Sequence, residues 1–314
     1  MTIAFLNEFH STRFFTTNRM ADSKKASHTA LMAAIHRFLA TKEEDPSFQG
    51  ADHLAGIFLP AKVKFFLSFK FIRKSVKKKM LRLVPGTYPY VTARTRYFDK
   101  VVNDALEEKL PQLILLGAGY DTRAIRFKAK LGNTQIFELD ESAIQAQKKK
   151  LLQKAAIELP NGLKFASIDF HADDLHNVLK KAGYDPTKKT LFLWEGVSMY
   201  LEEKAVTDML TFVAKNSGPG SSIAFDYFDK AILEENFDSY GAKEIATEVK
   251  KSGEPFKFGI DPQKIELFTR DHGFRLVSHI TPGKMEKDYL VNDNGILLGQ
   301  VYGFAYQVVA ETAH

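Results

Sequence analysis

The chain contains no cysteine among its 314 residues. That absence excludes disulfide bonds, thiolate metal sites and a cysteine nucleophile, and it fits a reducing compartment. No basic segment precedes an apolar run near the N-terminus, so we expect no signal peptide. The most apolar early segment, residues 57–71, is interrupted by Pro60 and by lysines, and is too short and too charged to span a bilayer. We therefore expect a cytoplasmic protein without a membrane span.

The chain has no internal repeat and no low-complexity tract. Its 45% hydrophobic and 26% charged residues are ordinary for a globular protein, and 26 phenylalanines can build a large core. Much of the net charge of +6 lies in residues 73–79, RKSVKKK. Such a run is typical of a solvated helix face, with an acidic partner, RNA or a membrane surface as alternatives. The lack of an Asn-Pro-Pro-Tyr-type motif argues against nucleic acid, and the sequence does not indicate an oligomeric state.

The first hundred residues have the apolar spacing of helices. Ser27 is a candidate N-cap for a helix whose apolar positions include Leu31 and Ile35. Residues 85–89, PGTYP, then break the chain, and a second helix is expected over residues 91–108. We interpret residues 1–108 as an N-terminal helical cap.

From residue 111 onwards, short apolar runs alternate with helical stretches. Helices are expected at residues 141–156, 202–215 and 262–272, and strands at residues 113–116, 135–139, 163–168, 190–194, 222–226, 274–280 and 299–310. This alternation predicts βαβ units and a doubly wound, mostly parallel seven-stranded sheet over residues 109–314. Residues 229–259, rich in Glu, Lys and Gly, interrupt the rhythm as a helical insertion. Cap and core together are expected to form one structural domain.

The first chemical signal is a glycine turn at residues 115–121. The first predicted strand ends at Leu116, and Gly117 and Gly119 follow it. Glycines there allow tight backbone geometry and close approach of a ligand, which in open α/β sheets binds beyond the carboxyl ends of the strands. Thr122 stands where a dinucleotide fingerprint has its third glycine. The turn alone predicts a nucleotide-type ligand, with a purely structural turn as the alternative.

Acidic residues end the next two predicted strands. Glu138 and Asp140 lie about twenty residues after the turn, where a carboxylate accepts hydrogen bonds from the ribose hydroxyls of NAD or of S-adenosylmethionine (SAM). Spacing does not choose between the two, and Asp140 could instead cap the following helix. At the third strand end, Asp169 can accept from an adenine amino group while the Phe170 ring packs on the base. An ordinary strand-end aspartate is the alternative.

The fourth predicted strand ends in Glu195, near the centre of the sheet. A carboxylate there can hold an ammonium or sulfonium cation, and Gly196 leaves room beside it. A merely polar strand end is the alternative. The missing third glycine and the acid at Glu195 favour SAM over NAD as the ligand.

Several segments carry a resemblance to a known family. Residues 116–122 (LGAGYDT), 137–140 (FELD) and 194–201 (WEGVSMYL) resemble the leucine carboxyl methyltransferase family. Residues 93–99 (ARTRYFD) and 27–30 (SHTA) are similar to its bacterial branch of SAM-dependent enzymes. These matches are spread over about residues 20 to 275. The resemblance implies a class I, Rossmann-like SAM-dependent methyltransferase fold with an antiparallel last strand.

The resemblance also implies roles for single residues. Asp140, rather than Glu138, would bind the ribose, and Asp169 with Phe170 would bind the adenine. Those assignments use the same strand ends that the spacing had indicated.

On the methionine side, the resemblance implies that Arg94 holds the SAM carboxylate, that Gly117 contacts the methionine part and that Glu195 holds the amino end. Two segments depart from the family pattern. The helix after the ribose carboxylate begins Glu-Ser where a proline is common, and residues 51–55 (ADHLA) replace an acidic-Pro-Tyr segment.

The expected chemistry is O-methyl transfer to a small molecule or to a protein C-terminal carboxylate. A carboxylate acceptor is already ionised and needs no general base, so we expect catalysis by positioning. Ser198 and Tyr200 lie near the expected substrate entrance, but no residue stands out as catalytic. The acids of residues 169–174 lie in one loop, and adjacent residues rarely converge on one ion, so no metal is expected. An NAD-dependent oxidoreductase and a non-catalytic SAM-binding protein with a basic partner-binding cap remain the alternatives.

Overall fold

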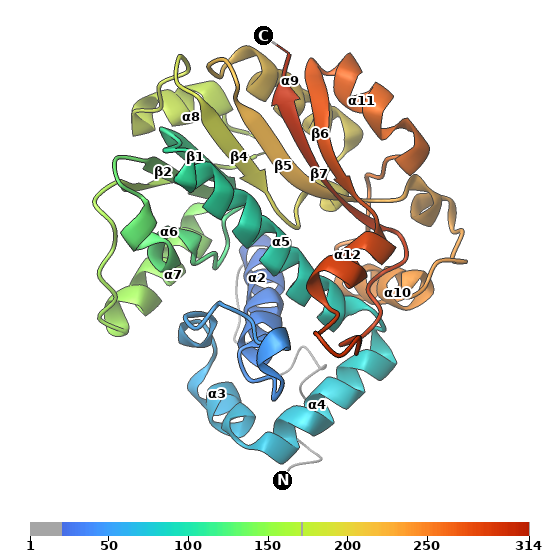
Figure 1. The fold of residues 1–314 in the computed structure, drawn as a ribbon. Coiled ribbons are helices and arrows are strands. Elements are labelled where there is room, and N and C mark those ends of the chain that lie inside the picture. Colours follow the sequence, from blue (N-terminus) through green and yellow to red (C-terminus); the bar gives the residue numbers. More distant parts are fainter. Residues whose placement is uncertain (1–20, 171, 314) are drawn as a thin grey trace.

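A seven-stranded sheet forms the centre of the molecule in the computed structural model (Figure 1). The structure describes residues 21–170 and 172–313, with side chains from His28 onwards. The strands follow the order β3-β2-β1-β4-β5-β7-β6. Their bounds are β1 (Gln112–Leu116), β2 (Gln135–Asp140), β3 (Leu163–Ser167), β4 (Thr190–Trp194), β5 (Ser222–Phe228), β6 (Phe274–Ile280) and β7 (Ala305–Thr312).

Strands β1 to β5 are parallel, whereas β7 runs antiparallel to both of its neighbours, β5 and β6. This arrangement confirms the predicted doubly wound α/β sheet with an antiparallel last strand. The chain leaves β1 towards β2 and β3, and then returns to form β4 on the other side of β1. The strand order therefore reverses between β1 and β4, which is the place where open α/β sheets bind their ligands.

Helices cover both faces of the sheet, which explains why the central strands are apolar throughout. Every residue of β1 and of β4 is buried. Leu113 and Leu115 pack in the core cluster that contains Phe98 of helix α5 (Thr87–Glu107), and Ile114 and Leu116 pack in the opposite cluster. A parallel sheet covered on both faces favours such continuous apolar runs.

The helices that follow the first strand are short or of moderate length. They are α6 (Arg123–Arg126), α7 (Ser142–Lys154), α8 (Leu175–Ala182), α9 (Glu203–Lys215), α10 (Ala242–Ser252), α11 (Ile265–Asp271) and α12 (Pro282–Tyr289). Short 3-10 turns supplement them: η4 (Lys128–Lys130), η5 (Ser198–Tyr200), η6 (Lys230–Glu234) and η7 (Pro262–Lys264). No helix within the described residues is long and apolar enough to cross a membrane.

The N-terminal region is a group of helices, most of which lie below the sheet in the view of Figure 1, whereas the last of them crosses one face of the sheet. Its elements are α2 (Ala21–Ala40), η2 (Pro46–Phe48), η3 (Ala55–Ile57), α3 (Ala61–Ser68), α4 (Lys70–Leu83) and α5 (Thr87–Glu107). Leu31 and Ile35 of α2 share a core cluster with Ile144 of α7. The Phe58 ring stacks on Tyr120 with centroids 4.6 Å apart. Arg37 of α2 donates to Tyr120 O at 2.7 Å, and this hydrogen bond holds α2 against the glycine turn.

Two predicted helix starts were wrong. Helix α2 begins at Ala21, so Ser27 lies inside a helix and is not its N-cap, and the Ser27 side chain lies outside the described part of the chain. Helix α5 begins at Thr87, four residues before the predicted start, and includes Pro89. Proline is tolerated in a first helical turn because the N–H groups there have no partner within the helix.

The prediction for the last strand was also wrong at its start. The strand begins at Ala305 and not at residue 299. The backbone N–H of Val301 donates to Glu286 of α12 at 2.8 Å, so this segment follows the helix and not the sheet. Helix α12 itself was not predicted, although Thr281 followed by Pro282 is a common helix start.

The predicted insertion at residues 229–259 does contain helical segments, η6 and α10. Its last residues return towards the sheet, where the N–H of Lys257 donates to Met199 O at 2.8 Å. The insertion therefore reaches the carboxyl ends of the strands.

Candidate functional site

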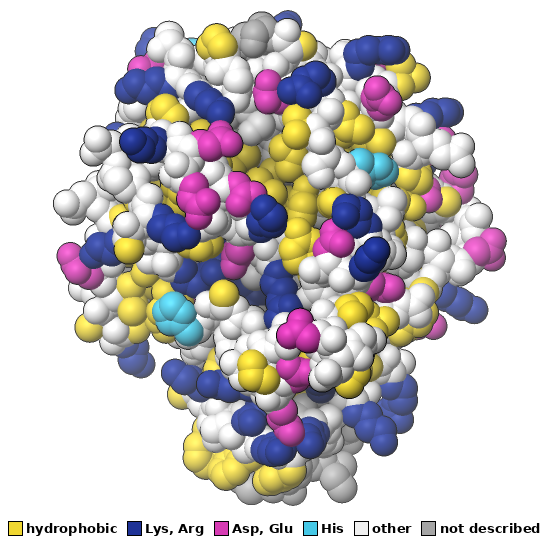
Figure 2. Space-filling model, viewed as in Figure 1, with side chains coloured by type: hydrophobic (Ala, Val, Ile, Leu, Met, Phe, Trp, Pro, Cys, Tyr) yellow, Lys and Arg dark blue, Asp and Glu magenta, His cyan; other side chains and the backbone are white. Residues whose placement is uncertain are grey.

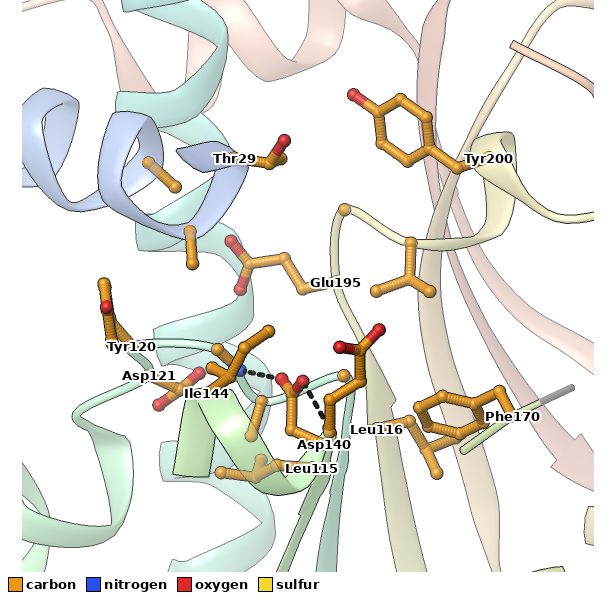
Figure 3. A pocket seen from close by; sticks show the side chains of 18 of the residues that line it. Thr29, Leu115, Leu116, Tyr120, Asp121, Asp140, Ile144, Phe170, Glu195 and Tyr200 are labelled. Atoms are coloured by element: carbon orange, nitrogen blue, oxygen red, sulfur yellow. Dashed lines mark hydrogen bonds between the residues drawn. The ribbon is translucent and has the colours of Figure 1, made fainter. Parts of the chain in front are cut away.

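A cavity of about 490 Å³ lies beyond the carboxyl ends of β1, β2 and β4 (Figure 3). Helix α2, the glycine turn, the ends of β2 and β4, and residues 253–257 of the insertion contribute to its walls. Seven of the eight predicted site residues line it: Arg94, Gly117, Gly119, Asp140, Asp169, Phe170 and Glu195. The fold thus brings together residues that are distant in the sequence, and the eighth residue, Glu138, lies apart from them.

The glycine turn has a backbone that only glycine adopts easily. Gly117 has φ +64°, and a Cβ atom at this position would lie 2.7 Å from Cγ2 of Val197. The next residue, Ala118, donates its N–H to Leu139 O at 2.9 Å and so ties the turn to β2. A side chain at residue 117 would collide with the opposite wall, so the glycine keeps the cavity open.

Asp140 ends β2 beside this turn (Figure 3). One carboxylate oxygen accepts from Gly119 N and the other from Glu141 N. Burial raises the pKa of Asp140, and these two hydrogen bonds oppose the rise. Each carboxylate oxygen has two lone pairs, so Asp140 can still accept from a ligand hydroxyl group. It does not cap α7, whose N-cap residue is Glu141.

Glu138 points away from the cavity and is 1% exposed. Its Oε2 atom lies 2.5 Å from Nζ of Lys148 in α7, which is equally buried. Burial raises the pKa of Glu138 to about 7, although the Lys148 ammonium opposes the rise. The pair joins β2 to α7 and leaves Asp140 as the carboxylate of this strand end that faces the cavity.

Asp169 and Phe170 follow β3 at the edge of the cavity, where Asp169 is exposed and Phe170 is half-buried. The acidic side chains that follow in this loop accept hydrogen bonds from backbone N–H groups. Asp173 accepts from Asp169 N at 2.9 Å, and Asp174 caps α8. Across the described residues, which leave out His171, no three His, Cys, Asp or Glu side chains gather as a metal site. The absence of a metal stays a prediction.

A chain of buried ion pairs runs from α2 to the end of β5 along one side of the cavity. Five carboxylates and four guanidinium groups take part, and none of their side chains is more than 14% exposed. In order along the chain of contacts they are Arg37, Asp52, Arg126, Asp99, Arg123, Asp121, Glu195, Arg94 and Asp226. The set carries one excess negative formal charge.

Glu195 is the member at the centre of the cavity (Figure 3). Its Oε2 lies 2.7 Å from Nη1 of Arg123, and its Oε1 lies 3.0 Å from Nε of Arg94. Arg94 also reaches Oδ2 of Asp226 at 2.9 Å. Gly196 has φ +72°, and a Cβ atom there would lie 3.0 Å from the Arg94 guanidinium. The two charged residues predicted for the methionine side, Arg94 and Glu195, are therefore held in place by other side chains of the protein.

Asp121 and Asp226 form ion pairs with Arg123 and Arg94, the two arginines that contact Glu195. Burial alone would raise the pKa of Asp121, but Arg123 and then Lys148 outweigh it and hold that pKa at about 2. Asp226 accepts from the Tyr90 hydroxyl at 2.6 Å and from Gly196 N at 2.6 Å. Asp121 is thus a fixed negative charge at the end of the glycine turn.

Thr29 of α2 and Tyr200 of η5 lie on opposite sides of the cavity (Figure 3). Thr29 Oγ1 donates to Glu254 of the insertion at 2.6 Å. Burial, with the nearby charge of Glu254, raises the pKa of Tyr200, so its phenol is neutral near pH 7. Ser198, by contrast, is buried, does not line the cavity and donates to Asp226 O at 2.6 Å.

The sequence interpretation missed most of the ion-pair chain. Asp99 and Asp121 lie within the motifs that carry the resemblance, yet they were given no role. Asp226 lies within β5 and could have been found by the strand-end reasoning that found Glu195. No local signal marks Arg37 or Arg123, because their partners are brought close only by the fold.

Comparisons with known proteins agree with this geometry. The sequence model of the leucine carboxyl methyltransferase family matches residues 30–214. YktD of Bacillus subtilis (strain 168), which bears the name of an S-adenosyl-L-methionine-dependent methyltransferase, is 30% identical over 204 residues, covering 65% of this chain and 67% of YktD. A similarly named protein of Mycolicibacterium smegmatis is 26% identical over 282 residues, covering 85% and 88% of the two chains.

Among solved structures, a protein from Thermobifida fusca YX that bears the name of a methyltransferase has the same fold. Its TM-score is 0.59 at 13% identity, and the match covers 90% of this chain and 94% of that chain. The family match spans more than half of the chain and includes the glycine turn, Asp140, Asp169 and Glu195. The chain belongs to the leucine carboxyl methyltransferase family, whose members include SAM-dependent methyltransferases.

Proposed function

We propose that this SAM-dependent methyltransferase binds SAM in the cavity and methylates an oxygen atom of an acceptor that enters between Thr29 and Tyr200. The observation that supports this proposal most directly is that the glycine turn, Asp140 and Glu195 face one cavity. Its volume of about 490 Å³ suits a ligand of nucleoside size.

The charge of the cavity supports SAM and argues against a dinucleotide. SAM carries a sulfonium, an ammonium and a carboxylate, and thus one net positive charge. The ion-pair chain, with five carboxylates and four guanidinium groups, has one excess negative charge, which complements it. A pyrophosphate would lie after the glycine turn, where Asp121 is ionised, so an NAD ligand would be repelled there.

The residue roles follow from this charge distribution. Asp140 would accept from the ribose hydroxyls, and Asp169 with Phe170 would bind the adenine. Glu195 would hold the ammonium group. Arg94 would hold the carboxylate, since a guanidinium has five N–H donors and two ion pairs leave some of them available.

The proposed catalysis is positioning. When bound, SAM supplies an activated methyl group on its sulfonium. The ion-pair chain fixes Glu195 and Arg94 before the ligand arrives, so little ordering is needed on binding. A carboxylate acceptor, on a small molecule or a protein C-terminus, would need no base, and neutral Tyr200 can donate a hydrogen bond to it. The cytoplasmic location stays a prediction.

Replacing Asp140 by asparagine should weaken SAM binding about tenfold. The amide keeps the shape but loses the charge that strengthens hydrogen bonds to the ribose. Isothermal titration calorimetry with SAM measures this effect, and NAD serves as a comparison ligand. Asp208→Asn, on the exposed face of α9, is the matched control and should bind SAM like the parent protein. Unchanged affinity in the Asp140 variant, or preferential binding of NAD, would refute the proposed site.

Replacing Tyr200 by phenylalanine should reduce turnover less than threefold, because positioning does not require a proton acceptor at that residue. The acceptor is first identified by mass spectrometry of a cell extract incubated with the protein and deuteromethyl-SAM. The rate of deuteromethyl transfer to that acceptor is then compared between variant and parent. If turnover collapses while SAM affinity is unchanged, Tyr200 takes a direct part in the chemistry and positioning alone is wrong.

A further inference from the structure

Three phenylalanines are exposed at the corner between α3 and α4. Phe65, Phe69 and Phe71 are 60%, 41% and 64% exposed, although they lie within seven residues of one another. Phe65 and Phe69 have ring centroids 5.3 Å apart, and Phe69 and Phe71 have centroids 6.0 Å apart. We call these three residues the aromatic tip. Contiguous exposed apolar surface of this kind marks an interaction site more often than isolated exposed residues do.

The aromatic tip lies in a strongly basic surround. Residues 60–83 contain seven lysines and two arginines and no acidic residue. Among the described residues, two acidic side chains that follow α2 form ion pairs with them: Glu44 lies 3.1 Å from Lys70 and from Lys74, and Glu43 lies 2.5 Å from Lys77. When these two carboxylates are counted against the nine cations of residues 60–83, the described part of this corner is positively charged.

The spacing of buried residues in helix α4 explains why its basic side chains face outwards. Its buried residues, Ile72, Val76 and Met80, follow one another at intervals of four and form the inner face. The basic residues therefore occupy the remaining faces of the helix, and Lys70, Lys74 and Lys78 are exposed. Figure 2 shows apolar side chains gathered at the lower end of the molecule, with Lys and Arg side chains beside them. In Figure 1 this is the end farthest from the sheet.

We propose that the aromatic tip and its basic surround dock the protein on the surface of an anionic lipid bilayer. Phenylalanine side chains partition into the boundary between headgroups and acyl chains, and lysine and arginine side chains are attracted to anionic headgroups. The combination of exposed rings and one-sided charge fits that surface chemically. No segment is inserted across the bilayer, because the docking involves only a helix corner.

A single-stranded nucleic acid is a poorer match for the same residues. Successive bases stack on aromatic rings that lie parallel to the strand of bases. The planes of Phe65 and Phe69 lie at 84° to each other, and those of Phe69 and Phe71 lie at 44°. The rings pack on one another and do not form a set of parallel platforms.

Docking at this corner would leave the methyltransferase site accessible. Helix α2 connects the two regions: Thr29 lines the cavity, and Glu43 and Glu44, which follow the helix, contact α4. The residues of the tip do not line the cavity. The proposal therefore does not depend on the identity of the acceptor or on the residue roles proposed for SAM.

Sedimentation with lipid vesicles tests the proposal. The full chain is mixed with vesicles of phosphatidylcholine containing phosphatidylglycerol and with vesicles of phosphatidylcholine alone. We expect binding to the first kind only, with a strong decrease at high salt. The variant Phe65→Ser/Phe69→Ser/Phe71→Ser should bind at least about tenfold more weakly, since the three apolar rings no longer partition into the interface.

Matched variants separate the two contributions. Val277→Ser/Ile296→Ser removes two exposed apolar residues elsewhere, 50% and 58% exposed, and should bind like the parent. Lys70→Gln/Lys74→Gln/Lys78→Gln should weaken binding to anionic vesicles at least about tenfold. An unchanged SAM affinity shows that each variant is folded.

Three outcomes would overturn the proposal. In the first, the protein does not bind anionic vesicles. In the second, the variant with serine in place of the three phenylalanines binds the vesicles as well as the parent does. In the third, the protein binds a single-stranded RNA oligonucleotide through the aromatic tip and does not bind vesicles. The last result would assign the same surface to nucleic acid.

Discussion

The variant Glu195→Gln should bind SAM about a hundredfold more weakly than the parent protein. Glutamine keeps the size of the side chain and removes its charge, so the ammonium group loses a charge-assisted partner worth about 3 kcal/mol. The same change deprives Arg94 and Arg123 of a shared carboxylate. Arg123 is 3% exposed, so water cannot replace the lost partner. We therefore also expect a lower thermal midpoint.

Titration calorimetry measures the affinity, and differential scanning calorimetry without ligand measures the midpoint. Glu158→Gln is the matched control, because Glu158 is 87% exposed and pairs with Lys128 on the surface. Exposed pairs contribute little, so this control should change neither quantity. Full SAM affinity in the Glu195 variant would mean that the ammonium group binds elsewhere and that Glu195 serves only to align the two arginines.

The sheet could be predicted from the sequence because its pattern is local. Each buried parallel strand is a short apolar run, and β4 was predicted at both ends because polar residues flank Thr190 and Trp194. The end of the chain was less regular. Residues 299–304 are as apolar as a strand, but Gly299 lies against Pro89 of α5, a contact that a strand pattern does not encode. Tertiary packing decided that boundary.

The candidate site was predictable to the extent that it follows strand ends. Gly117, Asp140 and Glu195 come directly after or at the ends of neighbouring parallel strands, which meet at one edge of the sheet. The ion-pair chain follows no such rule. Arg37 contacts Asp52 from helix α2, and Arg123 contacts Glu195 across 72 positions of sequence. A single sequence offers no signal for pairs that meet only after folding.

The choice between Glu138 and Asp140 illustrates the same limit. Both are carboxylates near the end of β2, and because successive residues of a strand point to opposite faces, residues two apart share a face. Glu138 and Asp140 are two apart, so the strand alone gives them the same direction. Their separation depends on Lys148, which approaches Glu138 from α7, and on Gly119, which donates to Asp140.

The variant Lys148→Met should be strongly destabilised above neutral pH. Removing the ammonium leaves the Glu138 carboxylate buried without its cation, which typically costs about 3–5 kcal/mol of unfolding free energy. Burial raises the pKa of Glu138 to about 7 even with Lys148 present. The variant lacks the Lys148 ammonium that opposes this rise, so the pKa of Glu138 rises further. The raised pKa makes the loss depend on pH.

The direction of this dependence follows from proton binding. In the unfolded chain the pKa of Glu138 returns to about 4.3, so between that value and the raised folded value the folded protein binds more protons than the unfolded one. The unfolding free energy of the variant therefore falls as pH rises through this window. Urea unfolding at pH 5.5 and pH 8 should show the larger loss at pH 8.

A second substitution isolates the carboxylate as the cause. Glu138→Gln/Lys148→Met has no buried charge at this position, so it should recover much of the stability at pH 8 and lose the pH dependence. It should also keep its SAM affinity, because Glu138 does not line the cavity. Equal losses at both pH values would show that Lys148 stabilises the fold through packing of its side chain and not through Glu138. A loss of SAM binding in the folded double variant would restore Glu138 as a ligand residue.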